Sequence, residues 1–207
     1  MAGCGSSAGP ASQGGGTPAA ATSSAGSGSG ASAGSGTPVS YRGPTLQTPT
    51  PAPPIILRNY LGQQVDTASY RGKALLVTFI YTHCPDTCPL IVANLHNALR
   101  LLGRRTSEVQ IVGVSTDPRG DTRQAVAAFL ARHEMTGRMQ YLTGSRAALV
   151  PVWRAWGIST SRPTSQDRVN HSALVYGITG SGKVTVVYPS NFTPADIAHD
   201  VPLLAAH

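Results

Sequence analysis

Residues 75–89 read LLVTFIYTHCPDTCP, and this stretch decides the fold because a strand and a helix meet within it. Leu75–Tyr81 form a nearly unbroken run of apolar or β-prone residues, which predicts a strand that is buried on both faces. Cys84 and Cys88 follow at once, and a helical spacing of apolar residues begins at Pro89. The stretch therefore predicts a strand-to-helix turn that carries two thiols.

Apolar periodicity continues this pattern along the rest of the chain. The first helix is expected to end at Gly103, and further helices are expected near 121–130, at 146–156 and from 193 onward. Asp121 or Thr122 could cap the helix near 121–130. Further strands are expected at 55–57, 63–65, 109–114, 139–142, 171–176 and 184–188. Strands that alternate with helices, followed by a final hairpin and helix, predict an α/β fold with a mixed central sheet flanked by helices.

Residues 1–52 differ in composition from the rest of the chain, because they are almost entirely Gly, Ser, Ala, Thr and Pro. Such a segment cannot bury enough apolar surface to offset the entropy of ordering it. We therefore predict a disordered tether over residues 1–52 and one globular domain over residues 53–207, which is an ordinary size for a single domain.

Cys4 stands alone within the predicted tether. The opening Met1–Ser7 resembles the end of a bacterial lipoprotein signal, in which small residues precede a lipid-bearing cysteine. The hypothesis is that the true start lies upstream and that Cys4 is the lipidated N-terminus, with a chance cysteine as the alternative. A long tether is what a lipid-anchored domain needs to reach its partners. The expected location is the extracytoplasmic face of a bacterial cell membrane, periplasmic or at the cell surface.

The charge pattern argues against one class of partner. The formal net charge is +7, but the arginines are scattered along the chain and form no run with interleaved aromatic residues. A nucleic-acid site needs a concentrated basic stripe, so nucleic acid is not an expected partner. An acidic protein partner or an anionic membrane surface fits the charge better.

The spacing of Cys84 and Cys88 supports two kinds of chemistry. On a helical turn, residues four apart lie on one face with their Cα atoms about 6 Å from each other. Two such thiols can hold one metal ion or form a reversible disulfide, and a helix N-terminus lowers the pKa of a thiol toward the thiolate that either role needs. An inert buried pair is the remaining alternative, and the polar, turn-forming neighbours argue against it.

His171 is the candidate third ligand. A lone histidine is more often a surface residue than a ligand, but one nitrogen added to two sulfurs completes a three-coordinate shell that suits Cu(I). His83, which abuts Cys84, is an auxiliary candidate.

The sequence of residues 78–89, TFIYTHCPDTCP, closely resembles the signature of the Sco/SenC family. Ser115–Pro118 with Asp121 and Thr122 resembles a second family segment, and the place of His171–Ser172 resembles that of the family's histidine ligand. The resemblance covers the chain from about residue 53. It implies a thioredoxin-like fold and a copper protein that helps to assemble the binuclear copper centre of cytochrome c oxidase.

By this resemblance, Cys84, Cys88 and His171 carry over as ligands of Cu(I), and the expectation extends to Cu(II). One position departs from the family pattern, because Asn170 stands where the family commonly has an Asp before the histidine. Asn keeps a hydrogen-bonding side chain but lacks the charge that could orient the imidazole or tune its basicity.

The leading hypothesis is therefore a membrane-anchored copper chaperone rather than an enzyme. Its expected partners are the copper-site subunit of cytochrome c oxidase and an upstream copper donor. The alternative is a thiol–disulfide oxidoreductase that uses Cys84 and Cys88 to reduce the copper-site cysteines of the oxidase and does not need His171. A peroxidase of the same fold ranks below both, because that chemistry does not ordinarily call for a Cys-x-x-x-Cys pair.

Overall fold

The strand β4 (Ala74–Ile80) lies inside the sheet, and all seven of its residues are buried. The computed structural model describes residues 3, 5, 40–159 and 173–207, and within them one eight-stranded sheet has the order β1-β8-β7-β4-β5-β6-β2-β3. The pairs β4–β5 and β5–β6 are parallel, and the other pairs are antiparallel. The predicted α/β fold with a mixed sheet is confirmed.

The elements have the following bounds. The helices are α1 (Thr87–Leu102), α2 (Arg123–Arg132), α3 (Arg146–Ala155) and α4 (Pro194–Ala206), with 3-10 turns η1 (Thr67–Tyr70) and η2 (Gly103–Glu108). The remaining strands are β1 (Thr45–Pro51), β2 (Ile56–Asn59), β3 (Gln64–Asp66), β5 (Val109–Ser115), β6 (Met139–Thr143), β7 (Val175–Ile178) and β8 (Lys183–Tyr188).

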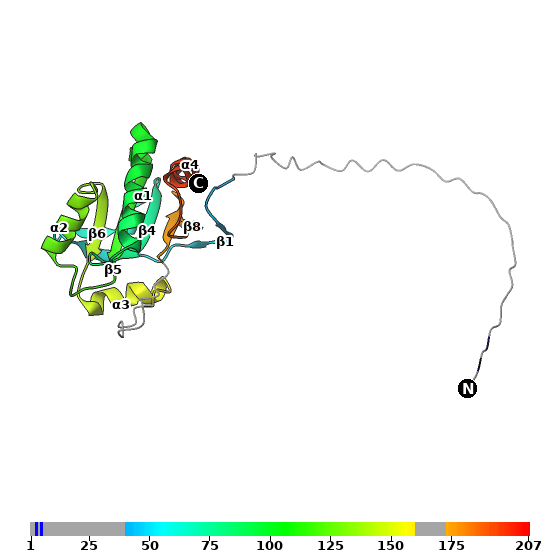
Figure 1. Ribbon diagram of the computed structural model, residues 1–207, viewed down its shortest axis with the longest axis horizontal. Helices are drawn as coiled ribbons and strands as arrows, with labels where there is room; N and C mark the ends of the chain where they lie inside the picture. Colours follow the sequence, from blue (N-terminus) through cyan, green and yellow to red (C-terminus); the bar gives the residue numbers. More distant parts are fainter. Residues whose placement is uncertain (1–2, 4, 6–39, 160–172) are drawn as a thin grey trace, which may run out of the picture. The chain divides into compact units, whose positions relative to one another are not determined.

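Alternate residues of β4 face two separate cores, as the pleat of a strand requires. Leu76 and Ile80 pack on the side that α1, α2 and α4 cover. Leu75, Val77 and Phe79 pack on the side of α3. Figure 1 shows α1 beside α4 and shows α3 on the opposite side of the sheet. Burial on both faces explains why the sequence of this strand has no polar alternation.

Helix ends follow local capping chemistry. α1 begins at Thr87, two residues before the predicted start, because the side chain of Asp86 accepts a hydrogen bond from the Thr87 N–H and caps the helix. It ends at the predicted Gly103, whose φ of +54° favours glycine. Of the two residues predicted to cap α2, Thr122 is the N-cap of the helix, and Asp121 has another role described below.

The sheet begins earlier in the chain than the predicted boundary between residues 52 and 53. β1 pairs with β8 although it lies inside the segment predicted as tether. All seven residues of β1 are exposed, and its sequence TLQTPTP lacks the apolar alternation by which strands are recognised. The folded part of the chain therefore includes β1, while residues 6–39 and Cys4 lie outside the described residues, so the tether stays a prediction.

A buried carboxylate holds the residues before β1 against α4. Asp200 is fully buried and accepts hydrogen bonds from the N–H groups of Arg42 and Gly43, at 2.8 and 2.9 Å. The hydroxyl of Tyr188 donates to the same carboxylate at 2.9 Å, and Nδ1 of His199 lies 2.8 Å from it. These contacts join α4, β8 and the chain that enters β1.

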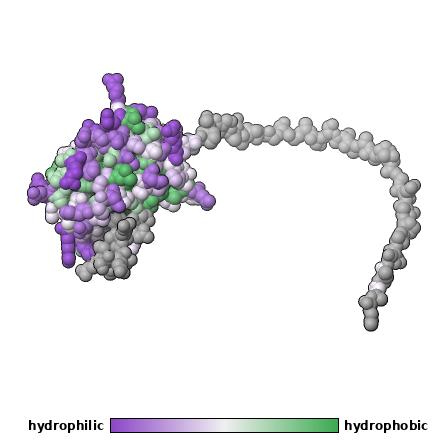
Figure 2. Space-filling view, in the orientation of Figure 1, coloured by the Kyte–Doolittle hydropathy of each residue, from purple (hydrophilic) through white to green (hydrophobic). Residues whose placement is uncertain are grey.

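The described surface carries few large apolar side chains. Leu46, Ile56, Leu61, Leu90 and Leu101 are exposed, and they come from separate parts of the fold. On the face in Figure 2, apolar residues form small separate patches among hydrophilic ones. Within the described ranges, no helix has the length and apolar character needed to cross a membrane.

We expect Asp200→Ala to lower the free energy of unfolding by about 3–5 kcal/mol, because it leaves several buried donors without an acceptor. Asp196→Ala, in the same helix, is the matched control. It removes only the exposed capping box with Thr193 and should cost about 1 kcal/mol. Urea unfolding followed by circular dichroism measures both, and equal losses would contradict the structural role given to Asp200.

Candidate metal centre

The two thiols lie at the start of α1, immediately after β4. Cys84 lies in the loop between β4 and α1 and is 9% exposed, whereas Cys88 lies in the first turn of α1 and is 1% exposed. Both cysteines are free, and the backbone N–H of Cys88 donates a hydrogen bond to Sγ of Cys84 at 3.3 Å. The predicted placement of this pair, which we call the dithiol, at a strand-to-helix turn is confirmed.

The environment of the dithiol makes its two sulfurs unequal. A hydrogen bond from the Cys88 thiol, with further backbone donors, lowers the pKa of Cys84 to about 5 against the opposing effect of burial. The same shared hydrogen bond, with burial, raises the pKa of Cys88 well above its ordinary value. At neutral pH the pair therefore holds one proton, with Cys84 as the thiolate and Cys88 as the thiol.

Tyr81 supplies another donor to this thiolate. Its hydroxyl hydrogen-bonds to Cys84, and burial, together with the nearby Cys84 charge, raises the pKa of Tyr81 to about 12. Tyr81 therefore stays protonated at neutral pH and stabilises the charged form of Cys84. Nothing in the sequence pattern singled out this tyrosine, because it looked like the last residue of the buried strand.

A single carboxylate joins three parallel strands beside the dithiol. Oδ1 of Asp121 accepts hydrogen bonds from both the backbone N–H and the hydroxyl of Thr82, each at 2.8 Å. Oδ2 accepts from the hydroxyls of Ser115, at 2.6 Å, and Tyr141, at 2.9 Å. Thr82 follows β4, Ser115 ends β5 and Tyr141 lies in β6, so the carboxylate fixes the edge of the sheet from which the dithiol projects.

Asp121 also acts on the dithiol through its charge. Burial raises the pKa of Asp121, while the hydrogen bonds from Ser115 and Thr82 favour its ionised form. The negative charge adds to the raised pKa of Cys88. Asp121 was one of the two residues predicted as a possible helix cap; the sequence signal for a different role was its place three residues after the Ser115–Pro118 segment.

His171, the third predicted ligand, lies outside the described residues, as does Asn170. The structure does describe the chain that follows them. Val175 pairs with Thr78 in antiparallel register, and the hydroxyl of Thr78 donates to the carbonyl of Leu174 at 2.9 Å. The chain thus enters β7 at the end of the sheet where β4 leaves for the dithiol.

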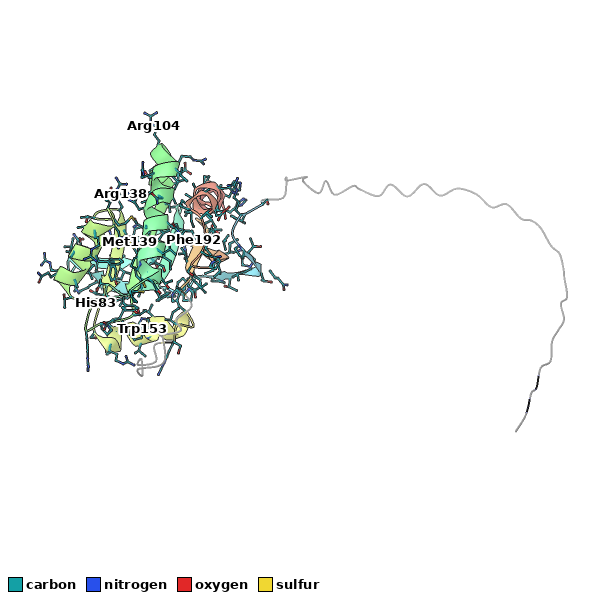
Figure 3. All side chains as sticks on the ribbon, viewed as in Figure 1. His83, Arg104, Arg138, Met139, Trp153 and Phe192 are labelled. Atoms are coloured by element: carbon teal, nitrogen blue, oxygen red, sulfur yellow. The ribbon has the colours of Figure 1, made fainter. Side chains whose placement is uncertain are left out.

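His83 does not join the dithiol as a third ligand in this structure. It is exposed, and its Nδ1 lies 3.1 Å from the hydroxyl of Thr82. Figure 3 shows it at the end of the molecule where α1 begins. Over residues 40–159 and 173–207, no three His, Cys, Asp or Glu side chains gather as a potential metal site. The described part therefore offers two soft sulfur ligands, one of them already ionised, which suits a soft cation such as Cu(I).

Comparison with known proteins gives a family match over most of the chain. The SCO1/SenC family model matches residues 47–206. The chain is 27% identical over 154 residues to the mitochondrial SCO1 homologue of Homo sapiens, and the match covers 72% of this chain and 50% of that protein. The chain thus spans about half the length of this curated relative.

Solved structures with the same fold include a copper-bound protein. ScoI of Bradyrhizobium japonicum with copper bound is 26% identical, with a TM-score of 0.66 and coverage of 75% of this chain and 99% of that one. A SCO1/SenC family lipoprotein of Bacillus anthracis is 26% identical, with a TM-score of 0.67 and coverage of 77% and 99%.

A third solved structure bears on redox chemistry. BsSco, described as having a disulfide switch and as a member of the Sco family of cytochrome c oxidase assembly proteins, is 25% identical, with a TM-score of 0.64 and coverage of 76% of this chain and 94% of that one. Together these likenesses confirm the predicted thioredoxin-like fold.

The unequal thiols predict a pH profile. Alkylation of Cys84 by iodoacetamide needs the thiolate, so its rate should fall with a midpoint at about pH 5 as the solution is acidified. In Cys88→Ala the largest donor to the thiolate is gone, and the midpoint should move up toward that of an ordinary thiol. Mass spectrometry of the labelled peptide measures both rates. An unchanged midpoint in Cys88→Ala would contradict the shared hydrogen bond.

Asp121→Asn should lower the free energy of unfolding by about 2–4 kcal/mol, because an amide offers one acceptor oxygen where four donors converge. Asp117→Asn is the matched control: Asp117 is only half-buried and accepts the Arg119 N–H at 3.2 Å, so its loss should cost about 1 kcal/mol or less. Denaturant unfolding under reducing conditions compares the two. Similar losses in both variants would argue against the role assigned to Asp121.

Proposed function

The chain belongs to the SCO1/SenC family, and from that premise we propose that it is a copper chaperone for the binuclear copper centre of cytochrome c oxidase. The observation that carries the proposal is the dithiol at the start of α1, with Cys84 held as a thiolate beside Cys88. Two sulfur ligands favour Cu(I) over harder cations. The copper-bound relative from Bradyrhizobium japonicum supports the same cargo.

His171 is the proposed third ligand of the copper ion. Val175, four residues after His171 in the sequence, pairs with Thr78 near the dithiol end of β4, and this pairing supports the choice of His171. A neutral imidazole can complete a three-coordinate shell around Cu(I), and the same three ligands are proposed for Cu(II). Asn170 next to it can accept or donate a hydrogen bond but gives the imidazole no charged partner.

Metal binding and release follow from the protonation of the two sulfurs. Cys84 binds copper without giving up a proton, whereas Cys88 must release its proton before its sulfur can bind. A coordination shell of three leaves room for an incoming cysteine of the oxidase copper-site subunit, so ligands can be exchanged one at a time. An upstream donor would load the site by the same exchange in reverse.

A thiol–disulfide oxidoreductase is the second candidate, and the unequal pKa values of the thiols favour it. The Cys84 thiolate would attack one sulfur of a partner disulfide, form a mixed disulfide and expel the other partner sulfur as a thiolate. Cys88, after losing its proton, would attack Cys84 and release the second partner thiol. Two electrons pass from the dithiol to the partner, and Cys84 and Cys88 end as a disulfide. The disulfide switch described for BsSco is consistent with this chemistry.

The proposed location is the extracytoplasmic face of a bacterial membrane, with the chain held through a lipid on Cys4. Supporting observations are the small residues before Cys4 and the Bacillus anthracis relative, which is described as a lipoprotein. Mass spectrometry of the N-terminal peptide from membranes of a cell that expresses the full gene would detect the lipid.

Copper titration separates the two candidate functions. The reduced full chain should bind one Cu(I) per molecule, and Cys84→Ser, Cys88→Ser and His171→Ala should each weaken binding by more than the roughly 10- to 100-fold that loss of an outer-shell partner causes. His207→Ala, at the exposed C-terminus, is the matched control and should leave affinity unchanged. Competition with a Cu(I)-specific chelator measures the affinities.

The opposite outcome would be weak copper binding that His171→Ala does not change, combined with a readily reduced Cys84–Cys88 disulfide. That outcome would reject the three-ligand chaperone and favour the reductase.

A further inference from the structure

A cavity of about 680 Å³ opens at the end of the sheet opposite the dithiol. Its buried lining includes Leu99 of α1 and Val109 of β5, and three exposed cationic side chains also line it: Lys73, Arg100 and Arg138. We call this site the basic cavity. Since β4 has seven residues and a strand rises about 3.3 Å per residue, the basic cavity and the dithiol lie about 20 Å apart.

The topology of the sheet brings these cations together. Lys73 directly precedes β4 and Arg138 directly precedes β6, and both strands run parallel to β5 between them. Arg100 lies in the last turn of α1, next to the same edge. Figure 3 shows Arg138 and Arg104 toward the end of the molecule where α1 finishes, and His83 toward the other end.

Nothing in the described part of the chain neutralises the three charges. No carboxylate lines the basic cavity, and none of the side chains of Lys73, Arg100 and Arg138 has an ion pair or hydrogen bond with another described residue. Glu108, which precedes β5, is paired with Arg105 at 2.9 Å. The C-terminus of α1 contributes a partial charge of only about −0.5, so a positive excess remains.

The volume of the basic cavity leaves room for ligands from a single phosphate ion to a phosphate ester or a lipid headgroup. Its volume falls within the range of roughly 300–1,000 Å³ that is typical of small-molecule sites. Gly103 and Gly137, both with positive φ, line it, and a Cβ added to either would meet nothing within 4 Å. Apolar lining side chains and cationic ones together suit an amphiphilic anion.

We propose that the basic cavity binds a phosphate-bearing ligand, either a free phosphate or phosphate monoester or the headgroup of an anionic phospholipid. Two guanidinium groups can each pair with phosphate oxygens in bidentate fashion, and the lysine adds a third positive charge. This site is separate from the dithiol and does not depend on copper.

The test compares two variants of equal net charge in the reduced full chain. Arg100→Gln with Arg138→Gln removes two cations from the basic cavity, and Arg123→Gln with Arg154→Gln removes two exposed cations elsewhere. Calorimetry with inorganic phosphate and with glycerol 3-phosphate probes the free ligand. Cosedimentation with phosphatidylcholine vesicles, with and without phosphatidylglycerol, probes the lipid headgroup. Copper binding and the unfolding midpoint should stay unchanged in both double variants.

The cavity variant should bind about 25-fold more weakly than the control variant, at roughly fivefold per charge for unit charges about 4 Å apart in water. Higher ionic strength should weaken binding further. Binding of the soluble phosphates that follows this pattern supports a free ligand, and binding of phosphatidylglycerol vesicles alone that follows it supports a lipid headgroup. Binding of neither probe, or equal binding by the two double variants, would overturn the proposal.

Discussion

The carboxylate of Asp121 is the interaction on which the arrangement of the dithiol depends. A buried carboxylate is costly unless donors surround it, and here four hydrogen bonds from Thr82, Ser115 and Tyr141 converge on its two oxygens. Because these donors belong to the chain at three neighbouring parallel strands, the loop after β4 has little freedom to shift. Cys84 lies two residues beyond Thr82, so the hydrogen bonds to Asp121 also restrict the position of the Cys84 sulfur.

The same local geometry explains why one site supports two candidate functions. Copper binding and thiol exchange both need an ionised sulfur next to a second sulfur that can lose a proton. The helix start, the hydroxyl of Tyr81 and the Cys88 thiol provide this by stabilising charge on Cys84. The copper chaperone needs a nitrogen ligand and the oxidoreductase does not, so the dithiol alone does not distinguish the two functions.

Much of the fold and of the site was predictable from sequence because the signals were local. The unbroken apolar run of β4 marked a strand with two buried faces, and Cys84 and Cys88 followed it at helical spacing. β1 was missed because its exposed Thr and Pro residues lack apolar alternation and its pairing with β8 is a long-range contact. The role of Asp121 was not predicted, because the sequence alone does not show that Thr82, Ser115 and Tyr141 come together around its side chain. His171 stays a prediction that the direction of β7 supports.

The composition of β1 also affects how this protein behaves among copies of itself. β1 and β3 are the two edges of the sheet, and an open edge can pair with another chain and start aggregation. Pro49 and Pro51 have no N–H to donate, so β1 is a poor template for a further strand. β3 has only three residues and offers little backbone to pair with. The Pro residues that made β1 hard to predict from the sequence thus also disfavour pairing of this edge with a second copy of the protein.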